Sequence, residues 1–170
     1  FNASIDSQLG LLQVKSIDHE ILIVNYACHP TTRAGYIISG DYPSAAVRAL
    51  KADSYSGRDV MFLQGAAGDL RVPCTNDEKT CFRQGDAVKV IEYGNVIADS
   101  VRKILKNGLK KVLPSFSAYK RDFVLPYDKN YVPATAITPE FTKLKNWRLK
   151  HEGTEGVKME CIVWKIASNC

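Results

Sequence analysis

Two short apolar stretches on either side of a helix-like segment limit this chain to very few folds. Residues 21–27 (ILIVNYA) and 59–65 (DVMFLQG) each have the length and composition of a buried strand, and the first is apolar enough to be covered on both faces. Between them, residues 41–52 have helical spacing, with Pro43 in the first turn and Ser39 or Asp41 as a candidate cap. Strand, helix and strand in this order pack most simply as a right-handed crossover with parallel strands.

The flanking segments extend this pattern. Residues 8–17 read as a strand that forms a hairpin with 21–27 through a turn at 18–20. Residues 85–107 form the longest helix candidate, with Gly94 as a weak point and Asn107-Gly108 as its stop. The remaining segments are an extended stretch, a loop, a short polar helix and a last strand, at 114–126, 128–139, 138–150 and 157–167.

This order of segments predicts an α/β fold with a mixed, partly parallel sheet flanked by helices. We expect a single α/β domain over residues 1–170, because no repeat or convincing linker interrupts the chain. Functional residues of α/β enzymes usually follow the carboxyl ends of strands. Since the chain stops directly after its last predicted strand, we expect an incomplete lobe of a larger catalytic domain.

Composition excludes several classes of function. The chain has 45% hydrophobic and 24% charged residues, as ordinary globular chains do, and no apolar run near the roughly 20 residues that span a bilayer. Its net charge of +5 is spread over several segments, which favours solvated surface over an anionic partner. It has no glycine-rich phosphate loop, zinc-finger spacing or RNA-binding aromatic motif, so we expect no nucleic-acid partner.

The five cysteines leave at least one thiol unpaired within the chain. Cys74 and Cys81 flank a polar loop that a disulfide could close in an oxidising compartment, and two unrelated thiols are the equal alternative. Cys28 lies in an apolar strand and is expected to be a small buried side chain.

The candidate chemistry lies where the two apolar strands end. His29 follows the first strand, and the run Gly65-Ala66-Ala67-Gly68-Asp69 follows the second. If the strands are parallel neighbours, His29 and Asp69 emerge at the same edge of the sheet, where an α/β site would form. A neutral imidazole is a common zinc ligand, a carboxylate could orient it or accept a proton, and the glycines would let N–H groups approach an anion.

A structural interpretation competes with this one at every position. A lone histidine at a strand end is often a hydrogen-bonded structural residue, and Asp41 and Asp69 could be helix or turn caps. His19 lies at the opposite end of the strand, and His151 follows a basic helix, so three ligands cannot be assembled. Cys28 and His29 point to opposite faces of a strand, which makes a poor nucleophile pair, and no G-x-S-x-G elbow exists.

Three ordered motifs, NYACHPTT, ISGDYPSAAVRAL and FLQGAAGDLR, resemble the neutral/alkaline (non-lysosomal) ceramidase family over about residues 10–105. The resemblance implies a central fragment of the N-terminal catalytic domain of a bacterial-type relative. It implies a zinc-dependent amidase that cleaves an N-acyl bond, with His29 as one zinc ligand. The family's other ligands, a histidine, a glutamate and a tyrosine, would lie outside residues 1–170.

One departure from the family pattern concerns the substrate. The family has a serine in a glycine-aspartate-valine-serine-proline motif, where this chain has Gly68-Asp69-Leu70-Arg71. Arginine cannot be a nucleophile, but it can bind a carboxylate or phosphate through two hydrogen bonds. We therefore expect Asp69 and Arg71 in catalytic positions, and Gly65, Gly68 and Arg71 on the substrate side.

The predicted function is that of a zinc-dependent hydrolase acting on an amide or ester of a lipid-like or other small substrate. Its expected partner is the rest of the same catalytic domain, and the resemblance favours a secreted or periplasmic location. The isolated 170 residues should bind zinc weakly and should not turn over. The alternative is a non-catalytic α/β binding or scaffold domain that has lost the site.

Overall fold

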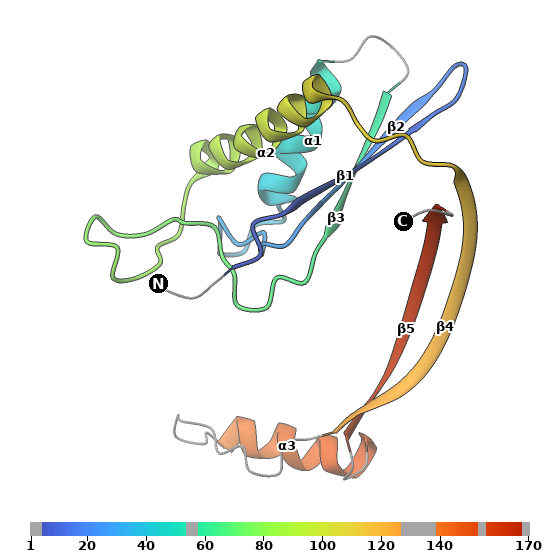
Figure 1. The fold of residues 1–170 in the computed structure, drawn as a ribbon. Helices are drawn as coiled ribbons and strands as arrows, with labels where there is room; N and C mark the ends of the chain where they lie inside the picture. The colour runs from blue at the N-terminus through green and yellow to red at the C-terminus, as the bar shows by residue number, and fades with distance from the viewer. Residues whose placement is uncertain (1–4, 54–57, 127–138, 153–155, 168–170) are drawn as a thin grey trace. The chain divides into compact units, whose positions relative to one another are not determined.

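The computed structural model describes residues 5–53, 58–126, 139–152 and 156–167. The chain forms two compact units, Phe1–Leu109 and Lys110–Cys170. The predicted α/β class with a partly parallel sheet is confirmed, whereas the single domain stays a prediction. The first unit contains β1 (Leu9–Lys15), β2 (Glu20–Tyr26), α1 (Asp41–Ala52), β3 (Arg58–Gln64) and α2 (Ala87–Asn107) (Figure 1).

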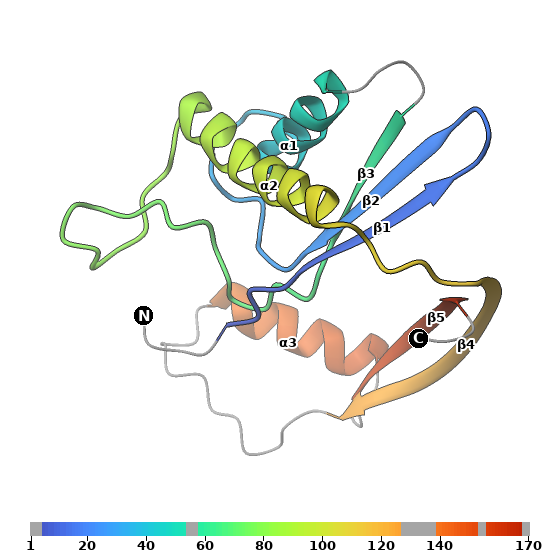
Figure 2. The same cartoon turned by 45° about the horizontal axis from the view of Figure 1, so that its top comes forward.

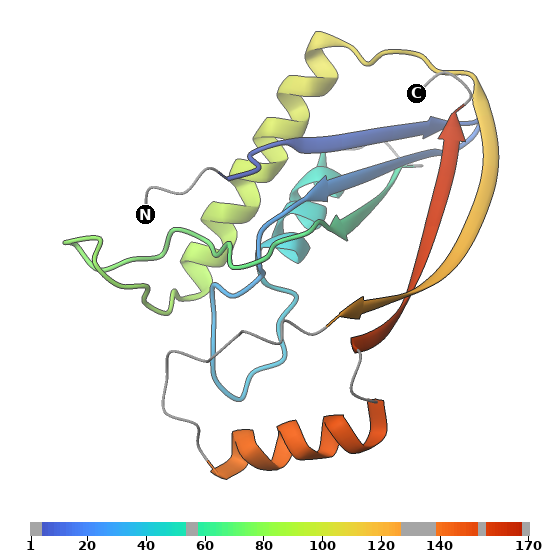
Figure 3. The ribbon, with the colours of Figure 1, turned by 60° about the horizontal axis from the view of Figure 1, so that its bottom comes forward.

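The three strands of the first unit form one mixed sheet in the order β1-β2-β3. β1 and β2 are an antiparallel hairpin that pairs Leu9 with Tyr26, and β2 and β3 run parallel with Glu20 opposite Arg58. The predicted hairpin and the predicted crossover through α1 are both confirmed. Because β2 and β3 are parallel, the loops that follow them leave the sheet at the same end (Figure 3).

The core of the first unit lies between this sheet and its two helices. α1 and α2 lie side by side over one face of the sheet (Figure 2). Leu22 and Val24 of β2 point into this layer, where they meet Tyr42 of α1 and Val101 of α2, all fully buried. Each such aliphatic side chain stabilises the fold by about 1.5–3 kcal/mol relative to an exposed one.

The opposite face of the sheet differs from the prediction. Met61 and Leu63 of β3 are 51% and 42% exposed on that face, so the described helices of the first unit cover one side of the sheet only. The apolar run at 21–27 is therefore not covered on both faces within this unit. Its side chains alternate instead: Leu22 and Val24 are fully buried, and Asn25, which follows Val24, is exposed.

The ends of α2 agree with the sequence, and its middle has a contact that the sequence did not predict. Asp86 caps the helix by accepting the Lys89 N–H at 2.9 Å, and Gly108, with φ of 84°, ends it as predicted. α2 continues without a break through Gly94, and the cost of this glycine in helix propensity stays a prediction. A Cβ at Gly94 would lie 2.5 Å from Ala45 Cβ and 2.8 Å from Ala46 N, so this glycine lets α1 and α2 pack closely.

The second unit is built differently. It contains β4 (Pro114–Pro126), α3 (Pro139–Glu152) and β5 (Gly156–Ala167), and β4 and β5 form a two-stranded antiparallel ribbon. The strands and helix predicted here are confirmed, while the predicted loop at 128–139 lies almost wholly outside the described residues. No helix in the described ranges has both the length and the apolar character needed to cross a bilayer.

Candidate functional site

Two loops at one edge of the three-stranded sheet lie side by side. We call residues 28–31 the HP turn and residues 65–71 the glycine turn. The Gly65 N–H donates to Tyr26 O at 2.9 Å, and the His29 N–H donates to Leu70 O at 3.0 Å. A parallel bridge also pairs His29 with Arg71. The sequence prediction that the two turns meet at one edge is confirmed.

Gly65 and Gly68 of the glycine turn are explained by two different features, a close backbone approach and a positive φ angle. A Cβ at Gly65 would lie 3.0 Å from Ala27 Cα, so any other residue would require the ends of β2 and β3 to move apart by a few tenths of an ångström. Gly68 has φ of 54° in a turn closed by the Leu70 N–H donating to Ala67 O at 2.8 Å. Since the Gly65 N–H is already bonded to Tyr26 O, the contact of Gly65 with substrate stays a prediction.

The half-buried His29 ring is oriented by the glycine turn. Its Nε2 lies 2.8 Å from Gly68 O, and because a carbonyl oxygen only accepts, Nε2 carries the hydrogen. In the neutral ring the lone pair is therefore on Nδ1. The backbone is restrained too: Pro30 disfavours helical geometry at His29, and the Thr31 N–H donates to His29 O at 2.9 Å.

This arrangement fits one metal ligand and no more. Metal-binding imidazoles commonly donate their other N–H to a carbonyl, as His29 does. Within the described ranges, no group of three or more His, Cys, Asp and Glu side chains comes together. His19 lies at the far end of β2, 3.0 Å from Asp59, as the sequence predicted, and the His151 side chain is outside the described set. Zinc itself stays a prediction.

Arg71 and Asp69 both expose their side chains beside the HP turn. The Arg71 guanidinium lies over the Phe82 ring, 5.2 Å from its centroid, and Nε is 3.5 Å from Thr31 Oγ1. Stacking on an aromatic ring orients the planar guanidinium and leaves its edge available to a carboxylate or phosphate. The predicted roles of both residues stay predictions.

Cys28, which belongs to the HP turn, is not an activated thiol. Cys28 is buried, as predicted, and burial raises the pKa of its thiol, so it is neutral at pH 7. Cys74 and Cys81 are free thiols, so the disulfide that the sequence left open is not formed in this structure. Cys28 therefore lacks the lowered pKa of a nucleophilic thiol.

Sequence reasoning missed Tyr42 and assigned Asp41 no role beyond a helix cap or a support for the metal ligands. Tyr42 is fully buried, its hydroxyl donates to Cys28 O at 2.6 Å, and burial raises its pKa. Gly40 occupies the N-cap position of α1, and the first two N–H groups of the helix donate to the side chains of Ser39 and Asp41, at 3.0 and 2.8 Å. The available signal was the pair Asp41-Tyr42 at the start of a predicted helix. The partner of the Tyr42 hydroxyl, Cys28 O, is 14 residues away, and no spacing along the chain indicates it.

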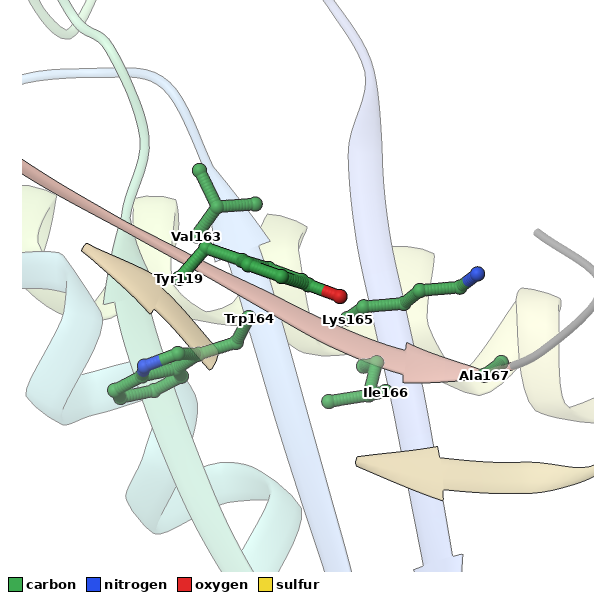
Figure 4. Close-up of a pocket in the computed structure, with 6 residues that line it drawn as sticks. All are labelled: Tyr119, Val163, Trp164, Lys165, Ile166 and Ala167. Atoms are coloured by element: carbon green, nitrogen blue, oxygen red, sulfur yellow. The ribbon is translucent and has the colours of Figure 1, made fainter. Parts of the chain in front are cut away.

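An open hollow lies elsewhere, on the β4–β5 ribbon of the second unit (Figure 4). It is lined by Tyr119, Val163, Trp164, Lys165, Ile166 and Ala167. Trp164 and Ile166 project from the face of β5 opposite to Val163, as alternation along a strand requires. None of the predicted site residues lines this hollow. Its large apolar side chains, those of Val163, Trp164 and Ile166, are exposed, whereas Ala167 is buried.

Comparison with solved structures finds similarity to the crystal structure of neutral ceramidase from Pseudomonas aeruginosa. The match has a TM-score of 0.57 and 14% identity, covers 86% of this chain and spans 30% of that one. The chain is similar in fold to part of a neutral ceramidase. At this identity the likeness concerns the fold alone. No family model matches the chain, and no curated protein matches it.

Proposed function

We propose that this chain is part of a zinc-dependent hydrolase of the neutral ceramidase kind, in which His29 supplies one zinc ligand through Nδ1. The observation that carries the proposal is the bond from Nε2 to Gly68 O, because it fixes the ring and leaves the other nitrogen as the lone-pair donor. The likeness in fold to a neutral ceramidase supports the reaction class. A secreted or periplasmic location stays part of this proposal.

The chain's own groups would then have distinct tasks. The chemistry that zinc supplies when bound is polarisation of a carbonyl and activation of a water molecule. The exposed Asp69 carboxylate can accept a proton at this edge of the sheet. Arg71, oriented by Phe82, can hold an anionic group of the substrate with its guanidinium edge. Arg71 thereby favours an N-acyl compound with a carboxylate or phosphate over an uncharged ceramide.

Metal analysis with matched histidine variants tests the proposal. His29→Ala removes the proposed ligand, and His19→Ala removes a ring that instead lies beside Asp59 at the other end of β2. We expect the protein that contains this chain to hold one zinc, His29→Ala to lose it with its fold intact, and His19→Ala to keep it. Equal zinc content in all three proteins would contradict the proposal.

A substrate pair tests the role of Arg71. We compare an N-acyl amino acid, which has a carboxylate beside its amide, with an N-acyl amine of the same chain length. Loss of one charge-assisted contact of about 1.5 kcal/mol in Arg71→Met should raise KM for the acid about tenfold and leave the amine unchanged. The exposed Arg83→Met is the control. An equal effect on both substrates would remove Arg71 from the substrate side.

The alternative function is a non-catalytic domain of the same fold. The feature that favours it is Arg71, which stands where the resembling family has a serine. This alternative predicts a folded protein without zinc and without hydrolysis of either N-acyl substrate. The same metal and substrate measurements therefore decide between the two.

A further inference from the structure

Asp41 is buried and conformationally disfavoured, yet it is the first residue of α1. It is 3% exposed and has φ of 49°, a region that residues other than glycine rarely adopt. Its carboxylate accepts from Thr32 Oγ1 at 2.5 Å, from the Arg33 N–H at 3.1 Å and from the Tyr42 N–H at 2.8 Å. Two of these three donors belong to the segment that directly follows the HP turn.

Tyr42 holds the other side of the same turn. Its hydroxyl donates to Cys28 O at 2.6 Å, and its ring packs edge-on against Phe62 with centroids 5.8 Å apart. Cys28 directly precedes His29, and Thr32 follows it by three residues. Two consecutive residues at the start of one helix therefore fix the chain on both sides of the imidazole.

We propose that Asp41 and Tyr42 are positioning residues that hold the His29 ring for the metal, an inference that rests on the proposed function. A single protein ligand must be held within about 0.5 Å to match ligands from other parts of a protein. The ring's own bond to Gly68 O sets its rotation. Two clamps, the bond of Asp41 to Thr32 and the bond of Tyr42 to Cys28 O, set the backbone from which the ring projects. Burial keeps water from competing for these bonds.

The carboxylate is required because each of its two oxygens accepts from a backbone N–H group, which can only donate. Asparagine would offer one acceptor oxygen and would turn its N–H₂ group toward either the Tyr42 N–H or the Arg33 N–H. Asp41→Asn should therefore release the segment after His29 while it keeps the size of the side chain. Tyr42→Phe keeps the contact with Phe62 and removes the bond to Cys28 O alone.

The test measures the order of the His29 ring without metal. The protein is labelled with ¹³C in its histidine rings, the His29 signal is assigned with His29→Gln, and ring order is obtained from relaxation. We expect an ordered ring in the unaltered protein. We expect order parameters below about 0.6, typical of flexible groups, in Asp41→Asn, and a smaller loss in Tyr42→Phe.

Controls separate positioning from general stability. Asp59→Asn removes an acid at the other end of the sheet, and Tyr119→Phe removes an exposed hydroxyl, so both should leave the ring ordered. Val101→Ala weakens the core from α2, a helix that contains neither Asp41 nor Tyr42, and should also leave the ring ordered. An ordered ring in Asp41→Asn, or a ring that Val101→Ala loosens equally, would overturn the positioning role.

Zinc titration then separates this proposal from the proposed function. Loss of partners that support a ligand commonly weakens metal binding 10- to 100-fold, and we expect this range for Asp41→Asn. An unaltered protein without zinc affinity would overturn the proposed function and the purpose of the clamp with it. Unchanged affinity in Asp41→Asn, with His29→Ala losing the metal, would overturn the clamp alone.

Discussion

The two units of this chain bury their apolar residues to different degrees. In the first unit, two helices and one face of a sheet enclose a continuous core that includes Leu22, Tyr42 and Val101. In the second, β4 and β5 pair from Ser117–Lys165 to Pro126–Gly156, but Ile162 and Trp164 of β5 are more than half exposed. The second unit thus has extensive strand pairing but little burial of apolar side chains.

The difference bears on where a site can be built. A binding site needs side chains whose positions are fixed by packing and hydrogen bonds. The two clamps around His29 are made by Asp41 and Tyr42, which are buried in the first unit. A two-stranded ribbon is marginally stable by itself in water, and large apolar surfaces mark places that another surface covers. We therefore expect the apolar side chains of the second unit to be covered by parts of the protein outside that unit.

The largest expected effect is on the core of the first unit. Leu22→Ala removes a fully buried side chain and should lower the free energy of unfolding by about 2–5 kcal/mol, because a cavity remains. The matched change Ile162→Ala alters a residue that is 53% exposed and should cost less than about 1 kcal/mol. Urea denaturation followed by circular dichroism measures both, and equal costs would show that the ribbon is packed as tightly as the core.

A smaller effect with an informative sign is expected at Gly94. In an exposed helix, Gly→Ala stabilises by up to about 1 kcal/mol. Here the new Cβ would press against Ala45 and the backbone of Ala46, so Gly94→Ala should destabilise by about 1–3 kcal/mol. The neighbouring exposed Asn95→Ala is the control and should be neutral or slightly stabilising. A gain in stability at Gly94 would mean that α1 and α2 do not pack as described.

Much of the fold could be predicted because its signals are local. The apolar stretches at 21–27 and 59–65 correspond to β2 and β3, and the segment 41–52 is α1 at both bounds. Glycine and proline mark the ends, and periodicity marks the interiors. The role of Gly94 could not be predicted, because helix propensity describes one helix and the contact that requires glycine comes from another.

The candidate site also has features that the sequence predicted and features that it did not. The meeting of the HP turn and the glycine turn follows from two parallel strands, and the sequence predicted it. The bond of His29 to Gly68, the three bonds of Asp41 and the bond of Tyr42 to Cys28 did not follow. They join residues by three-dimensional geometry, and no spacing along the chain reports which polar group meets which. The roles of Asp69 and Arg71 stay predictions for the substrate experiment.

The smallest expected effect concerns acid stability, and it compares one ion pair from each unit. Burial alone would raise the pKa of Glu20, but hydrogen bonds from Gln13 at 2.6 Å and from Arg58, with the charge of Arg58, hold it below its ordinary value of 4.5. A lowered folded pKa stabilises the protein above the unfolded value, and this contribution is lost as pH falls through the folded pKa.

Glu20→Gln should therefore cost about 0.5–1.5 kcal/mol at pH 7, and its difference from the unaltered protein should shrink as pH falls below about 4.5. Glu160→Gln removes the exposed partner of Lys120 on the ribbon and should change the free energy of unfolding by a few tenths of a kcal/mol at pH 7. Urea midpoints between pH 3 and 7 give both values. A Glu20→Gln difference that stays constant across this range would show that its carboxylate makes no pH-dependent contribution, and a larger loss at Glu160 would reverse the ranking of the two units.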